Sequence, residues 1–472
     1  MNTNIDKNRF PKIEKLIVVG LLIVIAISII NRIFSSPFDF DEGVGLSMSR
    51  VLLQTGKYSS FETLFDPVIT IGPTVYFPAA LTLVFGNIFL PRIIILIYSS
   101  LLIYIVASKF LKDNISRIFF LSLLFFTPYY FYFSAHVLGE VPAIFFSLTG
   151  LYFLNNKKYF LSGTFLALSI ITKNILILSL APALYLLYTQ KREISLRKIL
   201  SFIAPFFLIN GAWEIYKLQA FHFSIGSYLE NLYQFGRYNK SVTRIHLEYL
   251  PDRFAMLGGT FGINGYLFLL FMVSVSVYSF IKNHSYLIKS IALLTLVYLI
   301  YFFLLGSTVW YRHFFPAVVF FMIILTDLIS TTRLSKLSLI PVIFTLCVGL
   351  IFPLDTSKYL YQQNLLPLFN QVGDRFLSKS DVLNQQLETA NYISSFLPNE
   401  KISGVVWYNA PEISYLSDKQ IFRVPEGKNV SYLISHPFGR LLVPSVDARI
   451  TEYPFKQTLL DTPLYKIYKK ND

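Results

Sequence analysis

Three carboxylates stand within four residues directly after the first long apolar run of the chain. They are Asp39, Asp41 and Glu42, in a chain that holds only 27 Asp and Glu among 472 residues. Loss of hydration at an apolar surface raises the pKa of a carboxyl group, which suits a general base working near neutral pH. The same acids could instead cap the helix that residues 44–55 predict, because carboxylates stabilise a helix amino terminus.

A second polar group, His136 and Glu140, lies where the apolar run 139–154 begins. Glu140 could be only a favourable charge at a helix start, and His136 an interfacial residue bonded to lipid or backbone. By the topology derived below, however, both lie on the same side of a membrane as the first acids. That coincidence adds the hypothesis of one shared site to the purely structural interpretation.

Cations on the same side could bind an anion. Lys173 stands alone between two apolar runs, where an unpaired ammonium is costly unless it meets an anion or reaches the interface. Each such residue could be an ordinary interfacial anchor. Together, however, they oppose the usual accumulation of cations on the cytoplasmic side of a membrane, and this favours a bound phosphate. The oxygens of a phosphate match the donors of a guanidinium. The candidate phosphate ligands are Lys173, Arg312, Arg237 and Arg244, and the candidate substrate contacts are His136, Tyr58 and Tyr311.

The elements that must position these residues are membrane helices. The chain is 54% hydrophobic and 14% charged, with a mean hydropathy of +0.55, whereas soluble domains are about one quarter charged. A soluble domain and a disordered chain are both excluded. The net charge of +14 does not indicate nucleic acid, because the basic residues form short clusters between apolar runs. The single cysteine, Cys347, excludes a disulfide framework and a thiolate metal site.

Apolar runs of spanning length predict an all-α membrane protein with about eleven transmembrane helices. The runs are 16–34, 91–108, 117–134, 139–154, 159–172, 174–189, 199–219, 261–281, 286–305, 309–330 and 336–353. A cytoplasmic amino terminus then puts every short basic loop on one side, as the positive-inside rule requires. This agreement requires 72–89, with its two prolines, to be a re-entrant or interfacial segment.

The topology divides the chain into two predicted domains. Residues 1–353 form the transmembrane domain, whose first outer loop, 35–90, carries the acidic motif. Residues 354–472 form a small α/β domain outside the membrane. Its predicted elements are a helix at 383–397 and strands at 401–408, 421–424, 430–434 and 464–468.

The order of these features resembles the polytopic GT-C glycosyltransferases, and more narrowly the prokaryotic branch with protein O-mannosyltransferase-like and aminoarabinose-transferase-like enzymes. The likeness in layout covers about residues 10–330, and its specific part is confined to about 36–92. The features are an amino-terminal span, an outer loop with an Asp-Glu pair, an amphipathic helix ending LLQTGKY (52–58), a proline-containing apolar segment ending Phe85-Gly86, and a span opening with Pro91-Arg92.

The resemblance implies transfer of a sugar from a polyprenyl-phosphate carrier to an acceptor hydroxyl at the outer face of the membrane. By position, Asp41 would match the catalytic aspartate and Glu42 its neighbour, while Glu140 would match the acid of the second outer loop. Lys173 and Arg312 would match basic positions near the carrier phosphate. Asp39, two residues earlier, leaves open which aspartate is the base, and the loop 220–260 does not align.

The chemistry is consistent with this assignment. An inverting displacement at a sugar needs a base on the acceptor side and a stabilised leaving group on the other, and a phosphate is already a weak base. No cofactor is required. A divalent cation is compatible with the carboxylates and His136, but no HExxH motif, Walker loop or dinucleotide fingerprint supports ATP, NAD or zinc-hydrolase chemistry.

Rival functions stay open. Many spans with outward cations could form a lipid-linked oligosaccharide flippase or transporter, although such proteins keep ionisable residues at mid-membrane. A polysaccharide polymerase or ligase and a non-catalytic glycolipid binder are further alternatives. The expected partners are a polyprenyl-phosphate sugar, a glycan, lipid or protein acceptor, and the bilayer. The expected location is the plasma membrane, multi-pass, with a cytoplasmic amino terminus and the carboxy-terminal domain outside.

Overall fold

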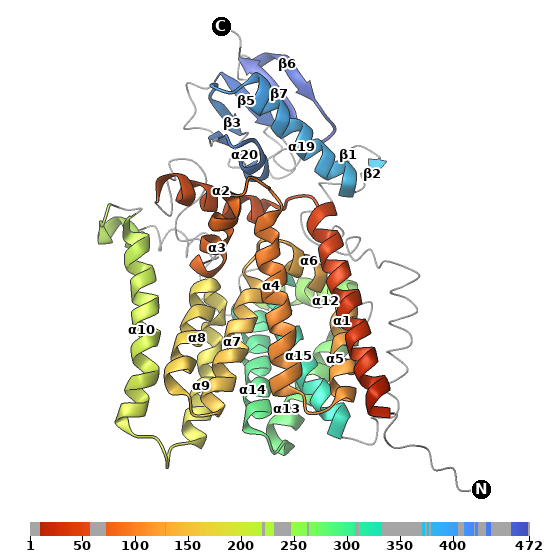
Figure 1. The fold of residues 1–472 in the computed structure, drawn as a ribbon, viewed down its shortest axis with the longest axis vertical. Coiled ribbons are helices and arrows are strands. Elements are labelled where there is room, and N and C mark those ends of the chain that lie inside the picture. The colour runs from red at the N-terminus through yellow and green to blue at the C-terminus, as the bar shows by residue number, and fades with distance from the viewer. Residues whose placement is uncertain are drawn as a thin grey trace, which may run out of the picture.

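The structure is a computed structural model. It describes residues 10–56, 72–127, 129–219, 222–230, 247–261, 264–306, 311–331, 371–372, 375–376, 379–404, 410–419, 421–422, 431–435 and 455–470. Most of these residues are helical, and their helices form an elongated bundle (Figure 1). A smaller unit that contains a β-sheet lies beyond one end of this bundle. The helix α2 lies between the two, and we call this end the α2 end.

The helices of the bundle lie along its long axis (Figure 1). They are α1 (Phe10–Ser35), α4 (Leu90–Ile105) with the π-helical turn η1 (Val106–Phe110), α5 (Asn114–Phe126), α7 (Glu140–Asn155), α8 (Tyr159–Thr172), η2 (Asn174–Ser179), α9 (Leu180–Thr189), α10 (Leu196–Leu218), α13 (Gly265–Lys282), α14 (Tyr286–Ile300) with η5 (Tyr301–Leu305), and α15 (Tyr311–Thr331). Among the described residues, 6 helices are long and apolar enough to cross a membrane. They are Ile13–Ser35, Leu90–Phe110, Leu196–Leu218, Gly265–Lys282, Tyr286–Leu305 and Tyr311–Ser330.

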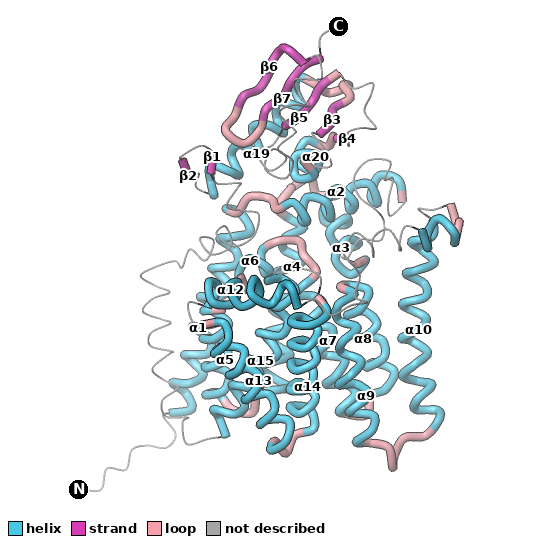
Figure 2. Tube along the Cα trace, turned by 180° about the vertical axis from the view of Figure 1, so that it is seen from behind, coloured by secondary structure: helices cyan, strands magenta, loops and turns pink. Residues whose placement is uncertain are grey.

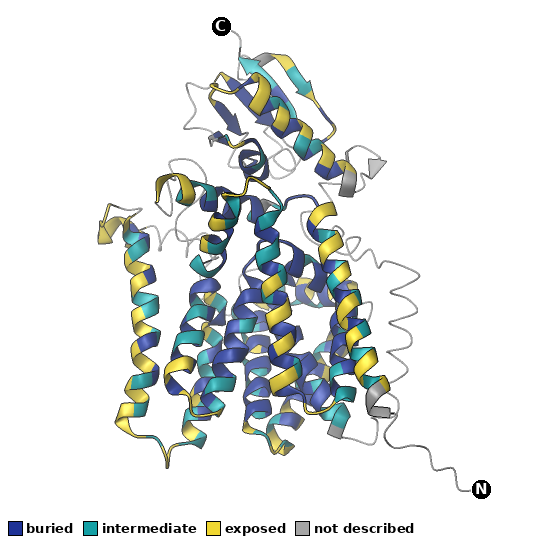
Figure 3. Ribbon diagram, in the orientation of Figure 1, coloured by how far each residue is buried: buried dark blue, intermediate teal, exposed yellow. Residues whose placement is uncertain are grey.

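The first helix shows how this sequence makes a lipid-facing surface. In α1, Leu21, Ile25, Ile29 and Ile33 are buried, and their spacing of four residues places them along one stripe of the helix. The opposite side is just as apolar but exposed. A helix that is apolar all round, with one face against protein, suits a bilayer on its other face. Figure 3 shows the same division for the bundle, whose inner helices are mostly buried.

Shorter helices cover the α2 end. They are α2 (Phe40–Thr55), α3 (Pro73–Leu83), α6 (Tyr130–Ala135) and α12 (Leu250–Phe261), which lies across the bundle in the view of Figure 2. With 11 residues, α3 is too short to cross a bilayer. Segment 72–89 is therefore not a full span, as the positive-inside argument predicts.

The smaller unit is an α/β arrangement. Its sheet has the order β4-β3-β5-β7-β6, with β3 parallel to β4 and β5, and β7 antiparallel to β5 and β6. A hydrophobic cluster joins α19 and α20 to the sheet through Ile393, Ile413, Ile402 and Ile467. The elements are β1 (Gln371–Val372), β2 (Arg375–Phe376), α19 (Lys379–Phe396), β3 (Ile402–Gly404), α20 (Pro411–Ser417), β4 (Ile421–Phe422), β5 (Tyr432–Ser435), β6 (Phe455–Asp461) and β7 (Lys466–Lys470).

Several of the elements predicted for this unit are present among the described residues. The helix α19 and the strands β3, β4, β5 and β7 overlap the predicted ranges, while residues 405–408, 423–424 and 430 of those ranges lie outside the described residues. The helix α20 and the strand β6 are missing from the prediction. In the bundle, the predicted run 117–134 is interrupted, because α5 ends at Phe126 and α6 begins at Tyr130. The predicted span 336–353 lies outside the described residues.

Two glycines let α2 lie between the bundle and the smaller unit. A Cβ atom on Gly43 would lie 2.5 Å from the backbone nitrogen of Glu412, at the start of α20. A Cβ atom on Gly45 would lie 2.4 Å from the Tyr76 ring of α3. Residues two apart point to nearly opposite sides of a helix with about 3.6 residues per turn. The two close approaches therefore hold α2 from opposite sides.

We expect Gly43→Ala to destabilise the protein by about 1–3 kcal/mol, because the added methyl group meets backbone atoms that cannot rotate away. The measurement is thermal unfolding of the purified protein in detergent. Gly211→Ala, in α10, is the matched control, since nothing lies within 4 Å of its added Cβ. Equal unfolding temperatures for the two variants would show that α2 and α20 are not packed this closely.

Candidate active site

The three clustered acids occupy three different environments at the start of α2. Asp39 is the N-cap of α2, and its Oδ1 atom accepts a hydrogen bond of 2.9 Å from the backbone nitrogen of Asp41. The Glu42 side chain completes a capping box by accepting a hydrogen bond from the backbone nitrogen of Asp39. The capping function that the sequence allows is thus carried by Asp39 and Glu42, and the Asp41 side chain points elsewhere.

Glu42 forms a fully buried ion pair with Arg92, the third residue of α4. Arg92 donates from Nε to Oε1 over 2.8 Å and from Nη2 to Oε2 over 2.7 Å, and both side chains have 0% exposure. The backbone nitrogen of Val137 donates a further bond of 2.9 Å to Glu42. Two buried charges are tolerated only when geometry and hydrogen bonding are this complete. Glu42 is therefore a structural anchor in this arrangement.

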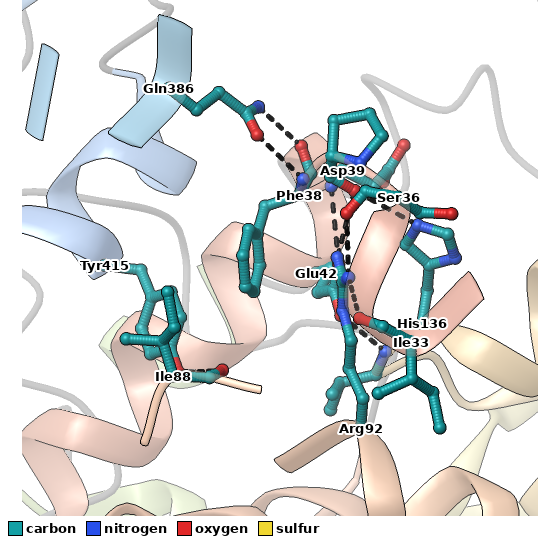
Figure 4. Close-up of polar contacts among 12 residues, drawn as sticks. Ile33, Ser36, Phe38, Asp39, Glu42, Ile88, Arg92, His136, Gln386 and Tyr415 are labelled. Atoms are coloured by element: carbon teal, nitrogen blue, oxygen red, sulfur yellow. Dashed lines mark hydrogen bonds and ion pairs between the residues drawn. The ribbon is translucent and has the colours of Figure 1, made fainter. Parts of the chain in front are cut away.

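Arg92 and His136 also hold the chain between α1 and α2 (Figure 4). Arg92 donates to the carbonyl oxygens of Ile33, Ser36 and Pro37 over 2.8, 2.9 and 2.9 Å. The buried His136 ring has one nitrogen 3.2 Å from the Pro37 carbonyl oxygen and the other 3.0 Å from that of Tyr132. His136 was expected to contact substrate, but both of its nitrogens face backbone carbonyls here.

The pKa shifts follow from these surroundings. Burial by itself would raise the pKa of Glu42, but the charge of Arg92 and its hydrogen bonds outweigh that effect and hold the pKa below its usual value. Burial raises the pKa of Asp39, although a Tyr132 hydrogen bond and nearby His136 oppose the shift. Burial lowers the pKa of His136 against the opposing charge of Glu42.

Asp41 pairs with Arg312 at the start of α15. The Nη1 atom of Arg312 donates to the Oδ2 atom of Asp41, and the two side chains keep 24% and 35% of their exposure respectively. This pair differs from the Glu42 pair because both of its side chains are partly exposed to solvent. Residues 271 positions apart thus bring a carboxylate and a guanidinium together at an accessible place at the α2 end.

A second ion pair lies nearby and is buried. The Nζ atom of Lys173, which follows α8, donates to Oε1 of Glu140 at the start of α7, with exposures of 6% and 1%. The other carboxylate oxygen of Glu140 is buried without a hydrogen bond in the structure. The backbone nitrogen of Val137, three residues before Glu140, donates to Glu42, and a ring nitrogen of His136 lies 3.2 Å from the Pro37 carbonyl oxygen. The two polar groups found in the sequence are therefore close in space.

The remaining predicted residues fall in two groups. Tyr311 is described, but its ring is 1% exposed and lies 4.5 Å, centroid to centroid, from that of Tyr129. The Tyr311 ring is thus packed in this structure, and its contact with a substrate stays a prediction. Tyr58, Arg237 and Arg244 lie outside the described residues. In the part of the chain that is described, no three His, Cys, Asp or Glu residues are grouped to hold a metal ion.

Sequence reasoning recognised Arg92 only as a landmark and missed its function. The available signal was an arginine at the start of an apolar run, where a charge needs a partner. It also missed Gln386 and Tyr415 of the smaller unit, which contact the same region. Gln386 hydrogen-bonds the backbone of Phe38, and the Tyr415 hydroxyl donates to the carbonyl oxygen of Ile88 over 2.8 Å. No local sequence pattern marks these two residues.

Chemically, the α2 end presents the partly exposed carboxylate of Asp41 paired with the partly exposed guanidinium of Arg312, beside the buried pair of Glu42 and Arg92. A carboxylate can accept a proton from a hydroxyl group. A guanidinium carries several N–H donors in a planar fork, and can bind a carboxylate on one edge and a phosphate on another. The arrangement suits proton abstraction beside a bound phosphate.

Comparison with known proteins shows that the fold is shared. The crystal structure of ArnT from Cupriavidus metallidurans bound to undecaprenyl phosphate matches with a TM-score of 0.64 at 12% identity, covering 96% of this chain and 97% of that one. The apo form of ArnT matches with a TM-score of 0.59 at 11% identity, with the same coverage. The apo oligosaccharyltransferase of Archaeoglobus fulgidus gives 0.50 at 10% identity, covering 89% of this chain and 69% of that one.

No protein-family model matches the chain, and no curated protein matches it in sequence. At such low identities the structural likeness establishes the fold alone. The overall fold of the chain is therefore the one seen in ArnT and in the Archaeoglobus fulgidus oligosaccharyltransferase.

We expect Glu42→Gln or Arg92→Met to cost about 3–5 kcal/mol of folding stability. Each change removes one charge of the pair and leaves the other buried without a counter-ion. The double variant Glu42→Gln/Arg92→Met should be more stable than Arg92→Met alone. Thermal unfolding in detergent is the measurement. Lys157→Met, which breaks the exposed pair with Glu193, is the control and should leave unfolding unchanged. Strictly additive losses in the double variant would contradict the pairing.

The lowered pKa of Glu42 sets a pH dependence. A carboxyl group whose folded-state pKa lies below its ordinary value of 4.5 stabilises the protein above that pH and loses this contribution as the pH falls through the folded-state pKa. The stability difference between the wild type and Glu42→Gln should therefore be constant near neutral pH and shrink below about pH 4.5. A difference that grows on acidification would show that the carboxylate is not stabilised by Arg92.

Proposed function

We propose that the protein is a membrane glycosyltransferase that moves a sugar from a polyprenyl-phosphate carrier to an acceptor hydroxyl at the outer face of the membrane, with inversion. The observation that carries this proposal is the accessible Asp41–Arg312 pair at the α2 end. The shared fold supports it, because one structure with that fold, ArnT, binds undecaprenyl phosphate.

Asp41 acts as the general base. The acceptor hydroxyl gives its proton to the Asp41 carboxylate as its oxygen forms a bond to the anomeric carbon of the sugar. The bond from that carbon to the phosphate oxygen breaks, and polyprenyl phosphate leaves with the electron pair. Its phosphate is already a weak base, so no second carboxylic acid is needed on the leaving side.

Arg312 stabilises the leaving phosphate. A guanidinium fixed beside the reacting centre offsets negative charge where it develops. Because Arg312 forms an ion pair with Asp41, the residue that binds the phosphate and the residue that accepts the proton lie next to each other. Lys173 is a second cation of the proposed site, with Glu140 holding its ammonium in place. Whether the transferred sugar is a hexose or a pentose depends on contacts beyond these residues.

Orientation follows from charge. The turns at the bundle end opposite to α2, such as those between α7 and α8 and between α9 and α10, carry Lys157, Lys158, Lys191 and Arg192 (Figure 1). The positive-inside rule assigns that end to the cytoplasm. We therefore place the amino terminus inside and the α2 end outside, with about eleven spans in residues 1–353 and residues 354–472 as an extracytoplasmic domain.

The test compares two aspartates by radiolabelled sugar transfer from polyprenyl-phosphate donors to a membrane extract. We expect Asp41→Asn to lower kcat by about 10²–10⁴-fold, since an amide cannot accept the proton. Asp39→Asn should retain activity, because asparagine caps a helix as well as aspartate does.

Loss of activity in Asp39→Asn with retention in Asp41→Asn would exchange the two roles. A wild-type protein that transfers no sugar from any donor, while labelled lipid crosses the bilayer in liposomes that contain it, would favour the flippase.

A further inference from the structure

The segment between α1 and α2, residues 36–39, is held from two sides. From the bundle, Arg92 and His136 bind the carbonyl oxygens of Ser36 and Pro37. From the smaller unit, the Gln386 side chain binds Phe38 (Figure 4). Each of three successive backbone carbonyls thus has a side-chain donor from a distant part of the chain. Such a segment has little freedom to move relative to the helical bundle or to the smaller unit.

The Gln386 side-chain amide hydrogen-bonds both the N–H and the C=O group of Phe38, the two groups that a neighbouring β-strand would pair. Its Oε1 atom accepts from the Phe38 nitrogen over 2.8 Å, and its Nε2 atom donates to the Phe38 carbonyl oxygen over 2.9 Å. Gln386 is 3% exposed and Phe38 is also 3% exposed, so both bonds are shielded from water. A buried amide that loses such partners leaves unsatisfied groups on both sides. The contact therefore requires a side chain at this position that both accepts and donates a hydrogen bond.

Further contacts from α20 hold α2 itself. The Ser47 hydroxyl donates to the Pro411 carbonyl oxygen over 3.2 Å, and Arg50 donates to the Tyr415 carbonyl oxygen. The Arg50 guanidinium lies 4.8 Å from the centre of the Tyr415 ring and forms an ion pair with Asp418. Together with the close approach at Gly43, these contacts run along α2 for two turns. The smaller unit thus contacts α2 along the part of the helix that follows Asp41 in its first turn.

We propose that Gln386 is a positioning residue for Asp41, and that the smaller unit takes part in the transfer by fixing the start of α2. This inference rests on the proposed function for its effect on turnover. The path is short: Gln386 fixes the Phe38 backbone, Phe38 precedes the N-cap residue Asp39, and the cap sets where α2 begins. Asp41 stands in the first turn of that helix.

The experiment compares Gln386→Ala with Gln385→Ala in the full-length protein. Gln385 is the matched control, because it precedes Gln386 in α19 and its Oε1 atom accepts from the Leu464 nitrogen over 2.9 Å, inside the smaller unit. We expect Gln386→Ala to lower kcat by roughly tenfold to a hundredfold with little change in KM for the donor, as a displaced base would. Gln385→Ala should retain kcat.

Gln386→Glu supplies a second readout that a general loss of stability would not produce. As a carboxylate it accepts from the Phe38 nitrogen but cannot donate to the Phe38 carbonyl oxygen, and as a neutral acid it does both. Its kcat relative to that of the wild type should therefore rise as the pH is lowered. A constant ratio across pH, or equal kcat losses in the two alanine variants, would overturn the proposal.

Hydrogen exchange separates this inference from the proposed function. In Gln386→Ala the amides of residues 36–43 should exchange faster, and in Gln385→Ala they should not. This arm needs no activity, so an inactive wild-type protein would refute the proposed function and still leave the positional coupling to be decided. Unchanged exchange in Gln386→Ala, in an active protein, would refute the coupling alone.

Discussion

The structure of the α2 end depends on one buried ion pair, that of Glu42 with Arg92. Both side chains are fully buried, and a buried charge is strongly destabilising unless its partner lies within hydrogen-bonding distance. Because the same guanidinium also binds carbonyl oxygens of Ile33, Ser36 and Pro37, the pair fixes the path of the chain from α1 into α2. Arg92 thereby connects the end of α1, the start of α4 and the first turn of α2. These contacts fix where the first turn of α2 lies, and so where the Asp41 side chain points.

The acidic residues at the α2 end have different structural roles. Asp39 caps α2, Glu42 forms a buried ion pair with Arg92, and Glu140 forms a buried ion pair with Lys173. Asp41 and Arg312 form an ion pair that keeps partial exposure of both side chains, and we propose that substrate binds there. Three neighbouring acids in the sequence thus act differently because burial and partners differ. The smaller unit adds the second hold on α2, from the side opposite to α3.

Much of this architecture could be predicted from the sequence, and the missing part has a physical reason. Apolar runs, the capping pattern from Asp39 to Glu42, and the short α3 segment are local signals. The partners of Glu42 and Phe38 lie 50 and 348 residues away, and only the packing of helices brings them together. The break between α5 and α6 lies inside an apolar run, where hydropathy cannot show it. The sequence of β6, FKQTLLD, lacks a regular alternation, and its pairing with β7 is irregular.

In the function that we propose, the Asp41–Arg312 pair binds the phosphate of a polyprenyl carrier. The most direct measurement is native mass spectrometry of the purified protein with undecaprenyl phosphate, comparing the wild type with Arg312→Gln and with Lys157→Gln at the opposite end of the bundle. We expect Arg312→Gln to lose bound lipid and Lys157→Gln to retain it as the wild type does. Lipid binding that survives Arg312→Gln and is lost in Lys157→Gln would refute phosphate binding at the Asp41–Arg312 pair, because the phosphate would then bind at the other end of the molecule.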